Sequence, residues 1–174
     1  MRQLKYHEKK LLRKVDLLEW KGTSTAREQT ATQKYCIEDR ETYTRYNMIV
    51  GKIRRLALAL AKLNDNEPIK QTMTRELSNK LHSVGLIPAK TLLECAKVGV
   101  GSFCKRRLSS VLADIKMVPD IKTGVTFVKG GHVKVGVETI TEPSLIVTRL
   151  MEDYITWRDG SKVKETISEF AENK

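Results

Sequence analysis

Glycine and proline divide residues 102–148 into short elements, and this punctuation constrains the fold more than any other feature of the chain. Ser102 is placed to cap a helix, and Pro119 and Asp120 start a second one. Gly130 and Gly131 end that second helix, because glycine is a poor helix former. The residues of the first helix expected to face inward are Phe103, Leu108, Val111, Leu112 and Ile115.

A small hairpin is expected directly after this pair of helices. Residues 132–135 alternate between apolar and polar side chains as a strand does, Gly136 marks a tight turn, and residues 137–140 pair back. Pro143 and Ser144 then break the chain before another apolar run. Two helices followed by a short sheet predict an α+β fold, with a compact unit over residues 102–148.

The residues before this unit carry helical patterns. Residues 4–20 are amphipathic, residues 25–63 continue as a helix, and residues 69–84 form a helix that Gly85 ends as a carboxyl-terminal cap. The spacing predicts two buried stripes, which are Ile49, Ile53, Leu56, Leu60 and Leu63 in one helix and Ile69, Met73, Leu77, Leu81 and Val84 in the next. A helical region over residues 1–101 follows from these patterns.

A short helix after Pro88 and a carboxyl-terminal extension over residues 149–174 complete the predicted organisation. Residues 99–101 predict a loop, because the third glycine of a phosphate-binding fingerprint is absent. In the extension, residues 154–157 predict one more strand and residues 163–170 a final helix.

The charge of the chain points to an anionic partner. Its 32 Lys and Arg against 21 Asp and Glu give a formal net charge of +11, which suits nucleic acid or an acidic membrane surface. No stretch approaches the roughly 18 apolar residues of a membrane span, so we expect no membrane partner. Aromatic residues make up only 6%, so few base-stacking surfaces are expected.

Cysteine and histidine usage argues against a metal site. Cys36, Cys95 and Cys104 are odd in number and widely spaced, and the histidines are scattered. We therefore expect no metal and no cofactor, and a reducing compartment. The Ser and Cys residues also lack a recognisable nucleophile setting, so we do not expect an enzyme.

Four motifs in residues 102–148 occur in order and at the spacing of a known RNA-binding domain. They are Arg107-Leu108, residues 128–132 (VKGGH), residues 133–136 (VKVG) and Pro143-Ser144. The segment resembles the RNA-binding domain of the ribosomal protein S4 family, which implies two helices, a short sheet and RNA binding. Ser109 stands where relatives carry an acidic residue, and Val125 where many carry arginine.

A closer resemblance covers nearly the whole chain. The segments that carry it are LKYHEKKLLRKVDLLEW, RETYTRYN, LHSVGLIP, SFCKRRL and TRLMEDYITWRDGSKVK. These five segments are similar to those of a eukaryotic family of U3 small nucleolar ribonucleoprotein components that interact with M-phase phosphoprotein ten. The resemblance implies a protein of the nucleus and nucleolus that helps the U3 small nucleolar RNA pair with precursor ribosomal RNA, without cutting it. The implied partners are these two RNAs, M-phase phosphoprotein ten and other proteins of the small-subunit processome.

The chemistry of the basic side chains indicates how such a domain holds RNA. Arg107 offers a planar fork of donors for phosphate or a guanine edge, and lysines supply point charges that bind the backbone without sequence choice. The candidate RNA-binding residues of the unit are Lys105, Arg106, Arg107, Lys122, Lys129, His132 and Lys134. His132 has two open interpretations, which are donation to a phosphate and stabilisation of its own turn. Phe103 and Phe127 are expected in the core, so we predict recognition of duplex or junction shape.

Further basic candidates lie in the helical region. They are Lys9, Lys10, Arg13, Lys14, Arg40 and Arg45. Residues 9–14 also have two other interpretations, a nuclear-import patch and a solvated helix face. Tyr43 and Tyr46 accompany Arg40 and Arg45, and we expect Tyr46 to pack against neighbouring helices.

Two alternative functions stay open from the sequence. One is a structural protein of the small ribosomal subunit. The other is a protein-interaction adaptor that uses an exposed stripe in residues 49–63 or 69–84.

Overall fold

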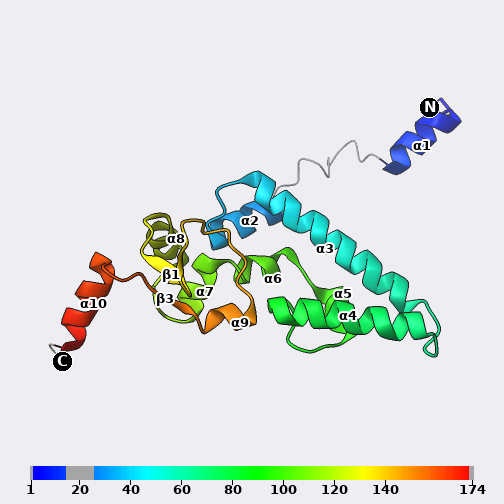
Figure 1. The fold of residues 1–174 in the computed structure, drawn as a ribbon. Coiled ribbons are helices and arrows are strands. Elements are labelled where there is room, and N and C mark those ends of the chain that lie inside the picture. Colours follow the sequence, from blue (N-terminus) through cyan, green and yellow to red (C-terminus); the bar gives the residue numbers. More distant parts are fainter. Residues whose placement is uncertain (1, 15–25, 173–174) are drawn as a thin grey trace.

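The computed structural model describes residues 2–14 and 26–172 and confirms an α+β fold (Figure 1). The amino-terminal part contains α1 (Tyr6–Lys14), α2 (Ala26–Tyr35), α3 (Arg40–Ala61), α4 (Pro68–Val84), α5 (Leu92–Lys97) and α6 (Val100–Lys105). It is followed by α7 (Leu108–Asp114), α8 (Ile121–Lys129), β1 (Val133–Val135), β2 (Glu138–Thr139), α9 (Arg149–Glu152), β3 (Ile155–Trp157) and α10 (Lys162–Glu172). α1 and α10 project from opposite ends of the body (Figure 1).

The predicted hairpin is present, and a third strand completes its sheet. The strand order is β2-β1-β3, with both pairs antiparallel and Val133 opposite Trp157. Gly136 adopts the left-handed conformation that the tight turn requires, with a φ of 64°. Because β3 comes from residues 155–157, the sheet of the 102–148 unit depends on the carboxyl-terminal extension.

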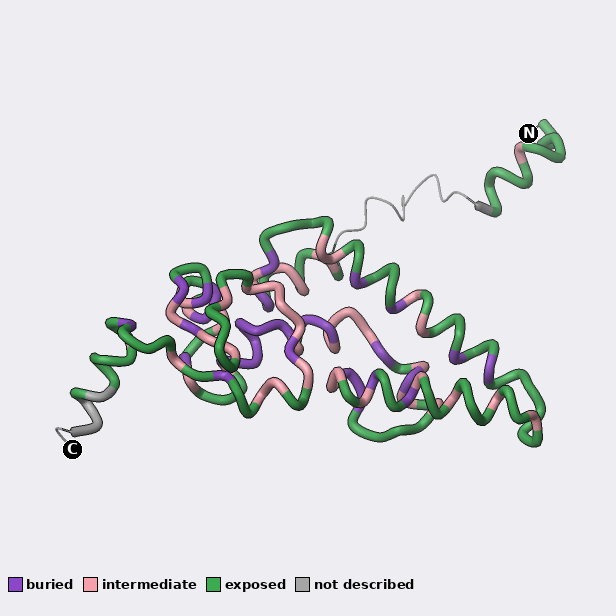
Figure 2. Tube along the Cα trace, viewed as in Figure 1, coloured by how far each residue is buried: buried purple, intermediate pink, exposed green. Residues whose placement is uncertain are grey.

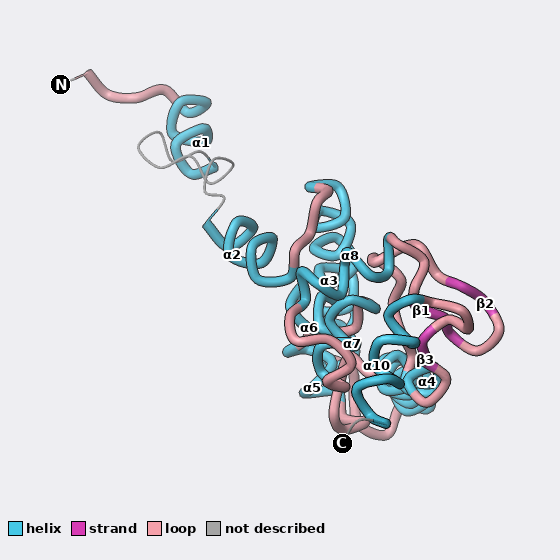
Figure 3. Tube along the Cα trace, turned by 90° about the vertical axis from the view of Figure 1, so that its left-hand side faces the viewer, coloured by secondary structure: helices cyan, strands magenta, loops and turns pink. Residues whose placement is uncertain are grey.

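The helices α7 and α8 pack on this sheet around a core of their own (Figure 3). A Cβ atom added at Gly124 in α8 would lie 3.0 Å from the backbone oxygen of Ser109 in α7, so the two helices approach closely there. The buried members of this core are Leu108, Val111, Leu112, Val118, Val128, Val133, Val147 and Ile155.

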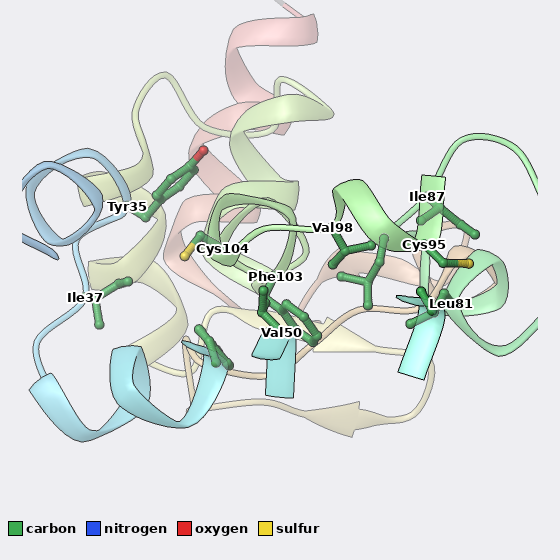
Figure 4. Packing of buried hydrophobic residues seen from close by; sticks show 12 residues of the cluster. Tyr35, Ile37, Val50, Leu81, Ile87, Cys95, Val98, Phe103 and Cys104 are labelled. Carbon is green, nitrogen blue, oxygen red and sulfur yellow. The ribbon is translucent and has the colours of Figure 1, made fainter. Parts of the chain in front are cut away.

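A second core lies among α3, α5 and α6 and takes in Leu81 of α4 (Figure 4). Tyr46 stacks on Phe103 with ring centroids 5.5 Å apart, which confirms that both aromatic rings pack internally. The fully buried Cys95 and Cys104 lie in the same core, and burial raises the pKa of both thiols. These two thiols therefore act as small apolar side chains.

The predicted helix over residues 102–115 is wrong in its continuity. α6 ends at Lys105 and α7 begins at Leu108, and Arg107 between them is extended and forms an antiparallel bridge with Ile146. The backbone of this break bonds to the segment after Pro143 and Ser144, through Leu108 N to Leu145 O and Val147 N to Arg106 O, each 2.8 Å. Phe103 therefore joins the α3 core, and Ile115 is 46% exposed.

The helix predicted over residues 25–63 is also interrupted. Residues 36–39 separate α2 from α3, with Cys36 at a φ of 48°. The loop predicted over residues 99–101 is wrong for Val100 and Gly101, which begin α6, whereas Gly99 lies outside the helix as its N-cap. Gly85 caps α4 in the left-handed conformation, as predicted. Of the predicted helix over residues 4–20, α1 covers the described portion, and residues 15–20 lie outside the described residues.

The buried face of α3 is rotated from the predicted stripe. Tyr46, Val50, Ala57 and Leu60 face the core, whereas Ile49 and Leu56 are each more than two-fifths exposed. Buried and exposed positions alternate along α3 in Figure 2. Both α5 and α6 pack against α3, and this packing selects the face that is buried. In α4, Leu81 is buried but Ile69 and Met73 are exposed. Among the described residues, no helix is both long and apolar enough to cross a membrane.

The contrast between Gly51 and Gly124 gives a test of this packing. In α3, a Cβ at Gly51 meets nothing within 4 Å, so Gly51→Ala is expected to stabilise the protein by about 0.5–1 kcal/mol. Gly124→Ala is expected to destabilise it by roughly 1 kcal/mol, because the new methyl group presses on the α7 backbone. Chemical denaturation measures both, and equal effects of the two substitutions would contradict the close α7–α8 contact.

Candidate nucleic-acid interface

Arg106 lies in the break between α6 and α7, where its guanidinium holds distant parts of the chain. Its Nε and Nη2 donate to the carbonyl oxygen of Val147 at 2.9 and 2.6 Å, and its Nη1 forms an ion pair with Glu152 of α9. The side chain is only 13% exposed. All three groups of the planar fork are therefore used within the protein, and RNA would have to displace them.

Arg107 is 3% exposed and lies beside Tyr46. Burial raises the pKa of Tyr46, and the Arg107 cation and its hydrogen bond oppose part of that increase. The Nε atom of Arg107 is buried without a hydrogen-bond partner. Arg107 reaches a cavity of about 190 Å³ whose other lining residues are Cys36, Glu38, Asp39, Thr42, Lys129, Glu142, Pro143 and Ser144.

Two of the predicted lysines form exposed ion pairs. Lys129 contacts both carboxylate oxygens of Glu38 at 2.5 Å, which links α8 to the connection between α2 and α3. Lys134 on β1 contacts Asp159 at 2.5 Å, and Lys164 contacts the other oxygen of the same carboxylate. Hydrogen bonds from these two lysines lower the pKa of Asp159 from 3.8 to about 2.

Lys105 and Lys122 are exposed, and neither forms an ion pair within the part of the chain that the structure describes. Lys116, which is not among the predicted RNA-binding residues, is also exposed, in the turn between α7 and α8 with a φ of 64°. Its position between two predicted helices could have indicated from the sequence that this lysine is exposed. Of the predicted residues in the unit, the cavity beside Arg107 brings together only Arg107 and Lys129.

His132 supports the hairpin. Its Nδ1 lies 2.8 Å from the hydroxyl of the buried Ser161, and its ring meets Phe127 edge-on at 6.0 Å. Its carbonyl oxygen accepts a hydrogen bond from the backbone N–H of Arg158 at 2.8 Å. These contacts favour the stabilisation of the turn over phosphate binding.

The predicted residues outside the unit fall into two groups. Arg40 pairs with Glu28 at 2.9 Å and Arg45 with Glu41 at 3.3 Å, and both arginine side chains remain largely exposed. Lys9, Lys10 and Arg13 lie exposed on α1, which ends at Lys14 and stands away from the body (Figure 1).

This arrangement of side chains can bind a polyanion through dispersed cations. Among the residues that the structure describes, no group of three or more His, Cys, Asp or Glu could hold a metal ion. Within the described residues 102–148, the lysines without an ion pair are Lys105 at the end of α6, Lys116 in the turn after α7 and Lys122 in α8, and exposed lysines of this kind suit contacts with a phosphate backbone.

Comparison with known proteins identifies the class of protein to which this fold belongs. Residues 3–104 match the family described as the ribosomal protein S4/S9 N-terminal domain. The matched region is the helical part that precedes the α7–α8 unit. Fold and family match together define an α+β protein of the ribosomal S4 class.

Relatives that align over nearly the full length of the chain identify a particular family within the ribosomal S4 class. The chain is 40% identical to U3 small nucleolar ribonucleoprotein protein IMP3 of Homo sapiens, over 100% of this chain and 96% of that protein. It is 42% identical to the Saccharomyces cerevisiae protein of the same name, over 96% and 92% of the two chains. Small ribosomal subunit protein uS4 of Picrophilus torridus is 27% identical, over 82% of this chain and 79% of that protein. The chain belongs to the family of U3 small nucleolar ribonucleoprotein protein IMP3.

Arg106 should be required for stability. Arg106→Leu removes two hydrogen bonds and leaves Glu152 without its cation, so we expect a loss of about 2 kcal/mol or more in the free energy of unfolding. The exposed Arg27→Leu is a control that removes the same charge. Denaturation curves that shift equally for both variants would contradict a structural role.

The Asp159 carboxylate gives a direct probe of the Lys134 contact. The lowered pKa means that its stabilising contribution is complete above pH 3.8 and is lost as the pH falls through about 2. Lys134→Met should raise the pKa of Asp159 but leave it below 3.8, because Lys164 remains. Carbon-13 NMR titration of the carboxyl group measures this pKa, and an unchanged value would show that Lys134 does not contact Asp159.

Proposed function

We propose that this protein is a non-catalytic RNA-binding component of the U3 small nucleolar ribonucleoprotein and small-subunit processome. The names of the full-length relatives carry this proposal, since the chain aligns over nearly its whole length with U3 ribonucleoprotein components. The net charge of +11 and the ribosomal S4 class of the fold support RNA as the ligand. Nucleolar location is part of the same proposal.

Within this particle, the protein promotes pairing of the U3 small nucleolar RNA with precursor ribosomal RNA. Two polyanions repel each other, and a basic surface lowers that repulsion by replacing condensed counterions. M-phase phosphoprotein ten and other processome proteins are its proposed protein partners. The net charge supports a mechanism that acts through the RNA backbone and needs no chemical step.

The proposed RNA surface of residues 102–148 is built on its free cations, Lys105 and Lys122, with Lys116 added. Lys129 and Lys134 can contribute, because exposed ion pairs are weak and phosphate oxygens can replace a carboxylate. Arg106 and Arg107 are largely buried and support the fold. Lys9, Lys10, Arg13, Lys14, Arg40 and Arg45 remain proposed contacts of the helical region.

A second candidate is a structural protein of the small ribosomal subunit. The uS4 relatives, at 25% to 27% identity, favour it. Sedimentation separates the two functions, since a ribosomal protein follows translating ribosomes and an assembly factor stays with large nucleolar precursors.

The annealing activity can be tested with purified protein. The protein is expected to accelerate hybridisation of a U3 RNA transcript to its ribosomal target, with a rate that falls steeply with salt. Lys105→Glu with Lys122→Glu should weaken RNA binding about tenfold or more across sequences, since each phosphate contact is charge-dependent.

The matched control is Lys52→Glu with Lys80→Glu, which changes the charge equally at two exposed positions on α3 and α4. Equal annealing rates with and without the wild-type protein at low salt would refute the proposed function. Equal binding by the two double variants would refute the proposed surface.

A further inference from the structure

A polar cavity of about 720 Å³ lies along α4, outside the unit formed by α7, α8 and the sheet. The turn between α3 and α4 contributes one wall, and the loop from α4 to α5 contributes Lys90. In Figure 1, α4 and α8 lie toward opposite sides of the body. The lining residues are Asp65, Lys70, Gln71, Thr74, Arg75, Ser78, Asn79 and Lys90.

Positive charge exceeds negative charge in this cavity. Lys70 donates to the carbonyl oxygen of Leu63 at 2.8 Å and to Asp65 at 2.6 Å, so these two charges compensate each other. Arg75 and Lys90 are exposed, and neither has an ion-pair partner in residues 2–14 and 26–172. The cavity therefore has two cations available to an anion.

The positive field continues toward the carboxyl end of α4. Partial burial lowers the pKa of His82, and the charges of Arg149 and Lys90 lower it further. Arg149 also donates to the carbonyl oxygen of Ile87, which fixes it beside the loop that carries Lys90. An anion held at Lys90 would thus meet the field of at least one further cation.

One polar atom of the cavity lacks a partner. The Oγ1 atom of Thr74 is buried and makes no hydrogen bond in the protein. The neighbouring Ser78 hydroxyl, in contrast, donates to the carbonyl oxygen of Arg75 at 3.1 Å. A buried hydroxyl without a partner costs free energy, so a ligand that supplies one gains affinity.

We propose that this cavity binds the sugar-phosphate backbone of RNA, with phosphate oxygens at Arg75 and Lys90 and the Thr74 hydroxyl bonded to the same nucleotide. The inference rests on the proposed function, because it names a second RNA contact of the same protein. Gln71 and Asn79 add amide groups that can both donate to and accept from a ribose hydroxyl. The lining contains no large apolar side chain to anchor a folded protein, so the chemistry favours RNA over a peptide.

A second site changes how the protein can act on RNA. Binding at one site raises the effective concentration of the same RNA at the other, provided that the RNA spans both. The α4 cavity can then hold one RNA region while Lys105 and Lys122 contact another.

The test compares Arg75→Glu with Lys90→Glu against the control Lys52→Glu with Lys80→Glu, using a U3 RNA transcript as probe. The cavity variant should bind the RNA at least tenfold more weakly than the control. The slope of log affinity against log salt concentration should become less steep by the amount expected for the loss of about two phosphate contacts. If the two variants have equal affinities and equal slopes, the cavity is not an RNA site. The proposed function would still stand in that case, provided that the wild-type protein binds the RNA. Absence of RNA binding by the wild type would refute the proposed function itself.

Thr74→Val separates the site from the fold. The substitution removes a hydroxyl that has no partner, so the thermal stability should stay the same or rise while RNA affinity falls several-fold. Unchanged RNA affinity in this variant would show that the hydroxyl does not contact RNA and would overturn that contact. A phosphorylated peptide is the second probe. If the cavity variant no longer binds this peptide but binds RNA as tightly as the control does, the proposal would also be overturned.

Discussion

The break at Arg106 and Arg107 connects the two hydrophobic cores of this protein. The extended Arg107 bridges to Ile146, and the guanidinium of Arg106 holds the carbonyl of Val147 and the carboxylate of Glu152. Phe103 before the break enters the core with α3, and Leu108 after it enters the core with α8 and the sheet. The relative placement of the two RNA-contact regions proposed above therefore depends on two arginines that are themselves largely inaccessible.

The distribution of the basic residues follows from this constraint. Arginine offers several donors in one plane, which suits a position where a carbonyl oxygen and a carboxylate must be bonded together. Arg106 and Arg149 each hold a backbone carbonyl of a distant segment, whereas Lys105 and Lys122 are left exposed. In this protein, arginines near the break fix the fold and lysines on the helices supply the surface charge.

The sequence predicts best those features that depend on local chemistry. The left-handed cap at Gly85, the turn at Gly136 and the helix that follows Asp120 were correct, because each depends on residues within a few positions. The rotation of α3 was predicted wrongly, because Ile49 and Val50 both fit a helical stripe and only the packing of α5 and α6 selects one face. The roles of the basic residues were similarly undetermined, since their acceptors at Val147 and Glu38 are distant in sequence.

The weakness of the exposed ion pairs fits the function proposed above, in which the protein binds RNA reversibly. Lys129 and Lys134 are held near their positions by Glu38 and Asp159, so little ordering is needed when a phosphate replaces the carboxylate. In the proposed complex, the two carboxylates compete with RNA phosphates for the same lysines, which lowers the RNA affinity. On this proposal, the surface would bind RNA transiently and with a strong dependence on salt, whereas a buried arginine clamp would release the RNA slowly.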